Sequence, residues 1–152
     1  MVDPGRVISL ASILVDLAVQ VPHLPDRGGD ILAAGARTEA AGGFNVLAAA
    51  ARQGVSCIYA GPHGTGPHGD RIRAALHAEG IPAAFPPRHD RDTGLCIVLV
   101  EPDGERTFIT TPGAESEAHT ADLDVLDVQP EDLIAVSGYD LVYPGSGPVI
   151  AE

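Results

Sequence analysis

Two kinds of hydrophobic pattern alternate along this chain. Short apolar runs at 7–15, 56–60 and 133–136 are typical of strands that are covered on both faces of a sheet. Residues 45–53 and 70–79 instead place apolar side chains at helical spacing, and a glycine follows each segment, as is common at helix ends. Strands that alternate with helices in this way predict βαβ units and a largely parallel sheet.

A second β pattern interrupts this alternation. Residues 95–100 and 106–110 are rich in β-branched residues, and the Asp103-Gly104 pair between them is typical of a hairpin turn. Residues 19–37 are rich in proline and glycine, with polar residues throughout. We therefore predict a second, antiparallel β region beside the parallel sheet.

Composition and charge narrow the class of protein. The 152 residues suffice for one domain with a hydrophobic core, and 45% of them are apolar. A formal charge of −12 argues against nucleic acid and anionic membranes as partners. The apolar run 7–21 contains Asp16 and is too short to span a membrane. Because Cys57 and Cys96 lie in apolar runs, we expect buried free thiols and a cytoplasmic location.

The most informative local pattern lies at residues 42–54. Gly42 and Gly43 can adopt almost any backbone conformation, and Asn45 follows them at the start of an alanine-rich helix that ends at Gly54. An amide side chain both donates and accepts hydrogen bonds, which suits the recognition of hydroxyl groups. An ordinary loop followed by a capped helix gives the same pattern, so this segment alone leaves both interpretations open.

Asp16 is the single charged residue of the run 7–21. Burying an unpaired carboxylate is costly, so Asp16 either emerges at the end of the first strand or has a hydrogen-bonding partner. Ligands of open α/β sheets bind at the carboxyl ends of strands, where we expect Asp16 to lie. A solvated strand end is the alternative interpretation of this residue.

Residues 64–69 have the spacing G-x-G-x-x-G of a dinucleotide-binding loop. We reject that function because the motif belongs after the first strand of a βαβ unit, and this segment follows the second. Pro67 also occupies the turn where a backbone N–H is needed. About twenty residues further on, where that motif has an acidic strand end, this chain has a proline-rich loop.

Histidine and serine residues offer two further kinds of chemistry, and neither finds support. His63, His68 and Asp70 form the densest group of possible metal ligands, but the Pro and Gly residues between them fix no ligand face. The Ser-Gly pairs at 137–138 and 146–147 lack the Gly-x-Ser-x-Gly frame of a nucleophile elbow. We therefore expect loop histidines and no acyl-transfer chemistry.

Taken in order, these segments resemble the N-terminal half of a PfkB-type (ribokinase-like) carbohydrate kinase. The resemblance extends from about residue 6 to 139, and within this range residues 103–108 and 112–114 also follow the family pattern. Two positions depart from the family pattern. The family's Gly pair usually lies further upstream of the Asn, where this chain has Ala40 and Ala41, and Thr65-Gly66 replace an acidic residue.

The resemblance implies an α/β fold, with a ribokinase-like three-layer αβα core, a partial and mostly parallel sheet, and a small β-sheet lid. Residues 1–152 would form the N-terminal part of a single domain, with lid segments at about 19–37 and 95–111. The C-terminal, nucleotide-binding half would be absent. Lids of this family pair, so we also expect a homodimer formed through the lid.

The same resemblance implies that the intact protein phosphorylates a hydroxyl of a sugar or nucleoside with ATP and Mg²⁺. In this family, an Asp at the position of Asp16 accepts hydrogen bonds from sugar hydroxyls. Asn45 would also contact the substrate, with Gly42 and Gly43 allowing its close approach. These four residues are the candidate substrate-binding site.

The catalytic base, the anion hole and the nucleotide pocket come from the C-terminal half of the family's domain. That half carries a Gly-Ala-Gly-Asp motif, which this sequence does not contain. We therefore expect no catalytic residue here, no ATP or metal bound by this chain alone, and no kinase activity from the 152 residues alone. A noncatalytic ribokinase-like domain for binding or dimerisation is the alternative, and an NAD-binding module is a more distant third.

Overall fold

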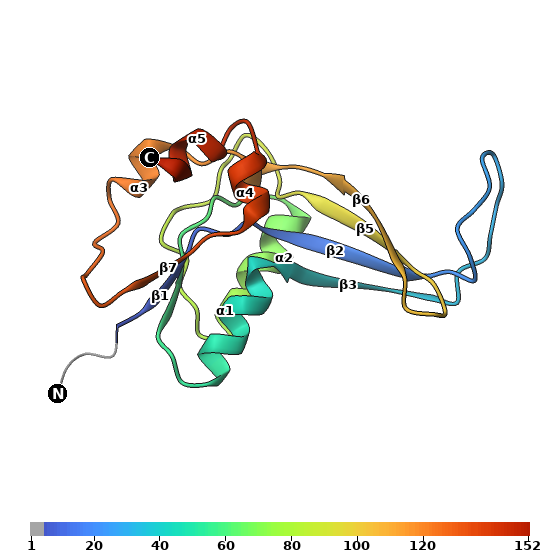
Figure 1. Cartoon of the computed structure of the whole chain (residues 1–152), viewed down its shortest axis with the longest axis horizontal. Coiled ribbons are helices and arrows are strands. Elements are labelled where there is room, and N and C mark those ends of the chain that lie inside the picture. Colours follow the sequence, from blue (N-terminus) through green and yellow to red (C-terminus); the bar gives the residue numbers. More distant parts are fainter. Residues whose placement is uncertain (1–4) are drawn as a thin grey trace.

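A computed structural model describes residues 5–152 (Figure 1). The strands, in chain order, are β1 (Val7–Ser9), β2 (Ile13–Gln20), β3 (Gly35–Gly42), β4 (Cys57–Tyr59), β5 (Leu95–Val100), β6 (Arg106–Thr111) and β7 (Leu133–Ala135). The helices are α1 (Gly43–Arg52), α2 (Pro67–Ala78), α3 (Thr120–Leu123), α4 (Gly138–Val142) and α5 (Gly147–Ala151), with a 3₁₀ turn at Ala114–Ser116. The strands form two separate sheets.

The core sheet has the strand order β4-β1-β7, and all of its pairs are parallel. Helix α1 contacts β1 and β4 of this sheet and β3 of the other, while α2 contacts β2 and β3. Helices α1 and α2 lie on one side of the sheets and α3, α4 and α5 lie on the other (Figure 1). This layering agrees with the α/β class that the sequence predicts.

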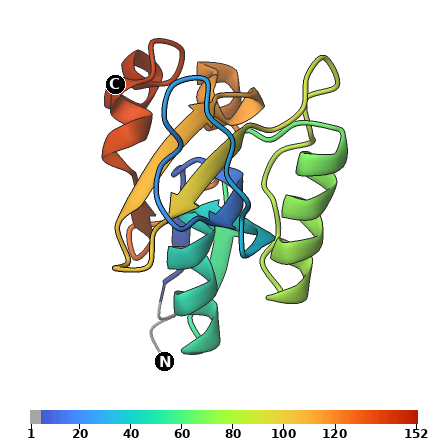
Figure 2. The same ribbon diagram turned by 90° about the vertical axis from the view of Figure 1, so that its right-hand side faces the viewer.

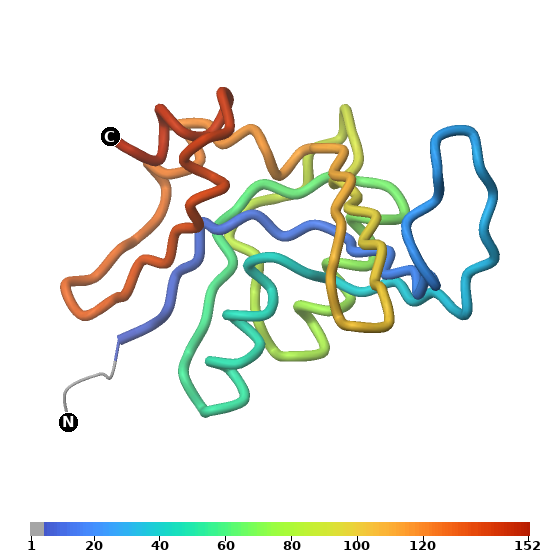
Figure 3. The backbone as a smooth tube through the Cα atoms, turned by 45° about the vertical axis from the view of Figure 1, so that its right-hand side comes forward, coloured from blue at the N-terminus to red at the C-terminus, as the bar shows by residue number. Residues whose placement is uncertain are grey.

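The lid sheet has the order β3-β2-β5-β6, in which β2 and β5 are parallel and the other pairs antiparallel. It extends away from the core, and the loop at 21–34 projects beyond its tip (Figures 1 and 3). Figure 2 looks at the lid end-on, with this loop in front. The hairpin predicted at 95–111 is confirmed, because β5 and β6 pair along their whole length.

The hydrophobic core lies where the base of the lid sheet meets the core sheet and the helices. Strand β2 contributes two fully buried residues near its start, Ile13 and Val15. Both belong to one cluster, whose buried members are Ile13, Val15, Leu47, Cys57, Tyr59, Ile72, Leu76 and Ile81. Burial of such side chains supplies most of the free energy that favours folding. The base of the lid is therefore part of the core.

Two predictions about the strands are wrong. Residues 7–15 do not form one strand, because the chain leaves the core sheet after Ser9 and enters the lid sheet at Ile13. The segment 19–37 is mostly the loop between β2 and β3, and the lid strands lie at 13–20 and 35–42 instead. Strand β3 contains mainly Ala and Gly, so its pairing with β2 rather than its own propensity makes it a strand.

Both cysteines are buried and free, as predicted. Cys57 lies on β4 in the core cluster, and Cys96 lies on β5. None of the helices in residues 5–152 is long and apolar enough to cross a membrane.

Candidate functional site

A pocket of about 700 Å³ lies between the lid sheet and the core. One wall comes from the lid strands β2, β5 and β6, and another from the end of β1 and the residues after it. The start of α1 and the segment from β7 through α4 complete the lining. The pocket therefore lies where the chain passes from the core to the lid.

Three polar side chains lie in one row on the lid wall. Asp16 on β2 is in register with Cys96 on β5, which is in register with Thr110 on β6. Side chains of directly paired residues lie on the same face of a sheet, and all three line the pocket. The Thr110 hydroxyl donates a hydrogen bond to Cys96 Sγ at 3.3 Å.

Asp16 lies in the middle of β2, so the prediction that it ends the first strand is wrong. It nevertheless lines the pocket, where it is partly buried. Burial raises the pKa of the Asp16 carboxyl above its ordinary value, and the carboxylate of Glu39, opposite it on β3, raises this pKa further. A partly desolvated carboxylate without a cationic partner among the pocket-lining residues is a strong acceptor for hydroxyl groups.

The two glycines at the start of α1 also line the pocket. Gly42 has φ of 67°, which favours glycine, and the backbone N–H of Gly43 donates to the Ser12 carbonyl at 2.9 Å. Asn45 lies in the first turn of α1, where it is exposed and is not among the residues that line the pocket. The structure thus brings Asp16, Gly42 and Gly43 to one pocket and leaves Asn45 beside it.

The wall from β7 and α4 was not part of the predicted site. Ser137, Tyr139 and Tyr143 line the pocket there, and the Ser137 hydroxyl caps α4 by accepting from the Tyr139 backbone N–H at 3.1 Å. Burial raises the pKa of Tyr143, and the carboxylates of Glu115 and Asp140 raise it further. The sequence carried one signal for this wall: Ser137 is a polar residue directly after the apolar run 133–136. Ligands of open α/β sheets bind at the carboxyl ends of strands, and the same argument singled out Asp16.

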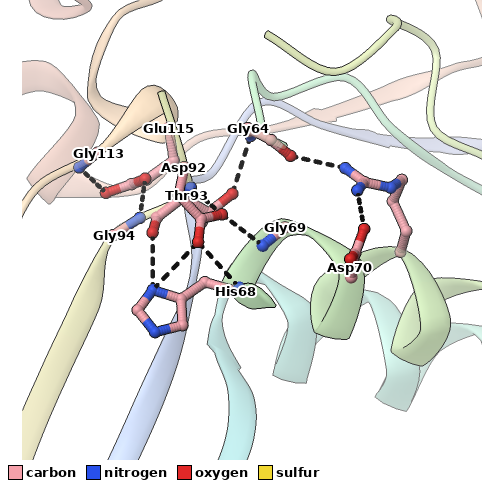
Figure 4. A network of polar contacts seen from close by, with 10 residues as sticks. Gly64, His68, Gly69, Asp70, Asp92, Thr93, Gly94, Gly113 and Glu115 are labelled. Atoms are coloured by element: carbon pink, nitrogen blue, oxygen red, sulfur yellow. Dashed lines mark hydrogen bonds and ion pairs between the residues drawn. The ribbon is translucent and has the colours of Figure 1, made fainter. Parts of the chain in front are cut away.

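The loop with G-x-G-x-x-G spacing has a structural role, seen in Figure 4. The Asp92 carboxylate accepts hydrogen bonds from the backbone N–H groups of His68 at 3.0 Å and Gly69 at 2.8 Å, at the N-terminus of α2. Burial acts to raise the pKa of Asp92, but hydrogen bonds from Gly69, His68 and Thr93 outweigh it and hold this pKa below its ordinary value. A protein carboxylate therefore occupies the place where a dinucleotide phosphate would bind.

Two of the three residues considered as metal ligands, His68 and Asp70, have other partners. The Asp70 carboxylate pairs with Arg73 at 2.5 Å, and the His68 ring lies with Nδ1 3.1 Å from the Thr93 carbonyl oxygen. Within residues 5–152 no group of three or more His, Cys, Asp or Glu side chains could hold a metal ion.

Comparison with known proteins places this geometry in a family. The family model described as pfkB family carbohydrate kinase matches residues 5–152. The chain belongs to the pfkB family. It is 33% identical over 147 residues to the uncharacterized sugar kinase YegV of Escherichia coli K12, a match that covers 96% of this chain and 45% of that protein.

Solved structures of a ribokinase and of a probable sugar kinase support the fold. A ribokinase from Cryptococcus neoformans in complex with ADP is similar with 26% identity and a TM-score of 0.64, over 72% of this chain and 34% of that one. A probable sugar kinase from Rhizobium etli is similar with 20% identity and a TM-score of 0.78, over 97% of this chain and 51% of that one. The ribokinase-like fold is confirmed, and the chain spans about half the length of the curated relative it matches.

Proposed function

We propose that the intact protein transfers a phosphoryl group from ATP to a hydroxyl of a sugar or nucleoside, with Mg²⁺. This chain supplies the substrate-binding wall and the lid. One observation carries the proposal: in a carbohydrate kinase fold, Asp16 presents a partly buried carboxylate to a pocket between lid and core.

The proposed substrate contacts differ in chemistry. The two Asp16 oxygens accept hydrogen bonds from adjacent substrate hydroxyls. Gly42 and Gly43 let a sugar ring approach the backbone, because they present no side chain to the pocket. Asn45 precedes Val46, which lines the pocket, and its amide would contact a substrate group that reaches the rim.

ATP and Mg²⁺ are assigned to no residue of this chain. The residues that line the pocket include no arginine, and the sequence contains no lysine, so this wall offers no cationic side chain to a triphosphate. Phosphoryl transfer depends on such groups together with a base for the acceptor hydroxyl. We therefore propose that residues 1–152 alone bind substrate weakly and transfer no phosphoryl group.

Substrate binding tests the proposal directly. A panel of neutral sugars and nucleosides is titrated into the chain by isothermal calorimetry, and the tightest ligand is then measured with Asp16→Asn. We expect a dissociation constant raised about tenfold or more, the effect of losing hydrogen bonds to a charged group. Glu39→Gln is the matched control, because this carboxylate faces Asp16 but does not line the pocket.

Two results would count against the proposal. Equal affinity in Asp16→Asn and the wild type would remove Asp16 from the site. Absence of binding by every compound would favour the noncatalytic alternative, in which the fold serves for binding or assembly.

We also propose that the chain self-associates through the lid. Strand β6 is an edge strand of the lid sheet and carries two exposed apolar side chains, Phe108 and Ile109. An edge strand with exposed apolar residues is prone to pair with another chain. Light scattering should show a dimer that Ile109→Glu converts to a monomer, and a monomeric wild type would refute the proposal.

A further inference from the structure

The chain crosses between the core and the lid sheet four times, at residues 10–12, 42–43, 93–94 and 112–113. The crossings lie in two close pairs. A Cβ atom added at Gly43 would lie 2.6 Å from the Ala11 carbonyl oxygen, and one added at Gly113 would lie 2.4 Å from Gly94 N. The position of the lid over the pocket therefore depends on how these two pairs are held.

Asp140 of α4 holds the first pair. Its Oδ1 accepts hydrogen bonds from both Ser12 N, at 2.9 Å, and Ser12 Oγ, at 2.5 Å. The Ser12 carbonyl in turn accepts the hydrogen bond from Gly43 N at the second crossing. Asp140 Oδ2 accepts from Ser137 N at 3.2 Å, which anchors the carboxylate to the wall after β7. Asp140 thus ties the first crossing to the wall after β7, and the second crossing is joined to it through the backbone of Ser12.

Glu115, in the 3₁₀ turn after β6, holds the second pair. Its Oε2 accepts from Gly94 N at 2.7 Å and its Oε1 from Gly113 N at 2.9 Å, as Figure 4 shows. These two glycines lie just before β5 and shortly after β6, so Glu115 joins the two ends of the hairpin. A carboxylate suits this task, because it offers two acceptor oxygens and no donor.

We propose that Asp140 and Glu115 are positioning residues that set the orientation of the lid sheet over the substrate pocket. Each is 1% exposed, and neither lines the pocket. They act through the crossings: Ser12 precedes the strand that carries Asp16, and Gly94 precedes the strand that carries Cys96. The consequence for substrate binding rests on the proposed function, whereas the consequence for lid orientation does not.

Near-isosteric amide variants separate positioning from packing. In Asp140→Asn and Glu115→Gln an NH₂ group replaces one acceptor oxygen, so it meets a backbone N–H donor and one contact is lost. Asp132→Asn is the matched control. Its carboxylate also accepts backbone hydrogen bonds, from Arg6 N and Gln129 N at 3.0 Å each, but it lies beside the start of β1, away from the crossings.

Residual dipolar couplings of the ¹⁵N-labelled chain measure the orientation of the two sheets without a ligand. In the wild type and in Asp132→Asn, we expect one alignment tensor to fit the couplings of both sheets. In Asp140→Asn and in Glu115→Gln, couplings from the lid strands should depart from the tensor fitted to the core sheet. If Asp140→Asn does not fold, Ser12→Ala removes the hydroxyl contact alone and takes its place in the coupling measurement, but not in the affinity measurement, because Ser12 lines the pocket.

Affinity for the tightest sugar or nucleoside gives the second readout, with an expected rise of about tenfold in dissociation constant for the two variants. A single tensor in both variants would overturn the inference, even if both lose stability. A wild type that binds no ligand would contradict the proposed function, and the couplings would still decide whether the two carboxylates position the lid.

Discussion

The two sheets of this molecule differ in how deeply their strands are buried, and the longer strands are not the more buried ones. Core-sheet strands have three residues each, while the lid strands have six or eight. Yet β1 and β4 of the core sheet are mostly buried, whereas β6 of the lid sheet, like the edge strand β7 of the core sheet, has no fully buried residue. The larger sheet therefore owes its place to its buried base at Ile13 and Val15 and to the crossings, and its outer part adds little to the core.

The largest expected effect tests this difference in burial directly. Leu47 of α1 is 0% exposed, and Leu32, in the loop at the tip of the lid, is 88% exposed. We expect Leu47→Ala to lower the free energy of unfolding by about 3 kcal/mol, because it leaves a cavity in the core. Leu32→Ala should cost less than about 1 kcal/mol. Urea unfolding of both variants checks this, and equal losses would show that the lid is as tightly packed as the core.

An intermediate effect is expected where the lid meets the core. A methyl group at Gly94 would lie 2.3 Å from Glu115 Oε1, so Gly94→Ala forces a shift at a lid crossing. We expect a loss of about 1–3 kcal/mol, typical of overpacking. Gly104→Ala in the hairpin turn is the control: its φ of 88° makes alanine strained, but no atom lies near the added methyl group.

Lid strands should respond to Gly94→Ala more than the core does. Hydrogen exchange in the variant should quicken at the amides of β5 and β6 while β1 and β4 keep their protection. Uniform quickening across both sheets would mean that the lid and the core unfold as one unit.

The smallest expected effect is a pH dependence of stability that arises from a histidine beside the core sheet. His63 follows β4, is buried, and has no hydrogen-bond partner for Nδ1 among the described residues. Burial lowers the pKa of His63, and Arg73 lowers it further, while a hydrogen bond with the Gly61 backbone acts in the opposite direction. In the unfolded chain His63 takes up a proton near pH 6.5, whereas in the folded chain it takes up this proton only at lower pH. Stability should therefore fall as pH drops below that value.

His63→Leu isolates this contribution. The difference in unfolding free energy between wild type and variant should change between pH 7.5 and pH 5.5, with the wild type losing more stability on acidification. Urea unfolding at both pH values measures it. A difference that stays constant would show that His63 takes up its proton equally well in both states.

Local patterns predicted the elements whose causes are local. The hairpin at 95–111 follows from Asp103-Gly104 between two β-branched runs, and α2 follows from helical spacing closed by Gly80. The family and the pocket residues Asp16, Gly42 and Gly43 were also readable as motifs. Their assignment as substrate contacts is still a prediction.

What the sequence could not show depends on contacts between distant residues. The apolar run 7–15 gives no sign of a break, because the break at Ser12 is held by Asp140, 128 positions away. Strand β3 exists because β2 pairs with it, against the weak propensity of its Ala and Gly residues. The roles of Asp140 and Glu115 likewise arise from backbone groups that carry no signal in the sequence.

The parallel pairing of β2 with β5 has a consequence for how the chain folds. Asp16 and Cys96 are neighbours in that pair, although 79 residues lie between them along the chain. Such pairing closes a long loop, and its entropic cost is met late, after local structure has formed. During synthesis, β2 can pair with β3 as soon as both have emerged, but its other edge must wait until β5 leaves the ribosome. Until then that edge is open to pairing with other chains, so the lid is the region where we expect premature aggregation to begin.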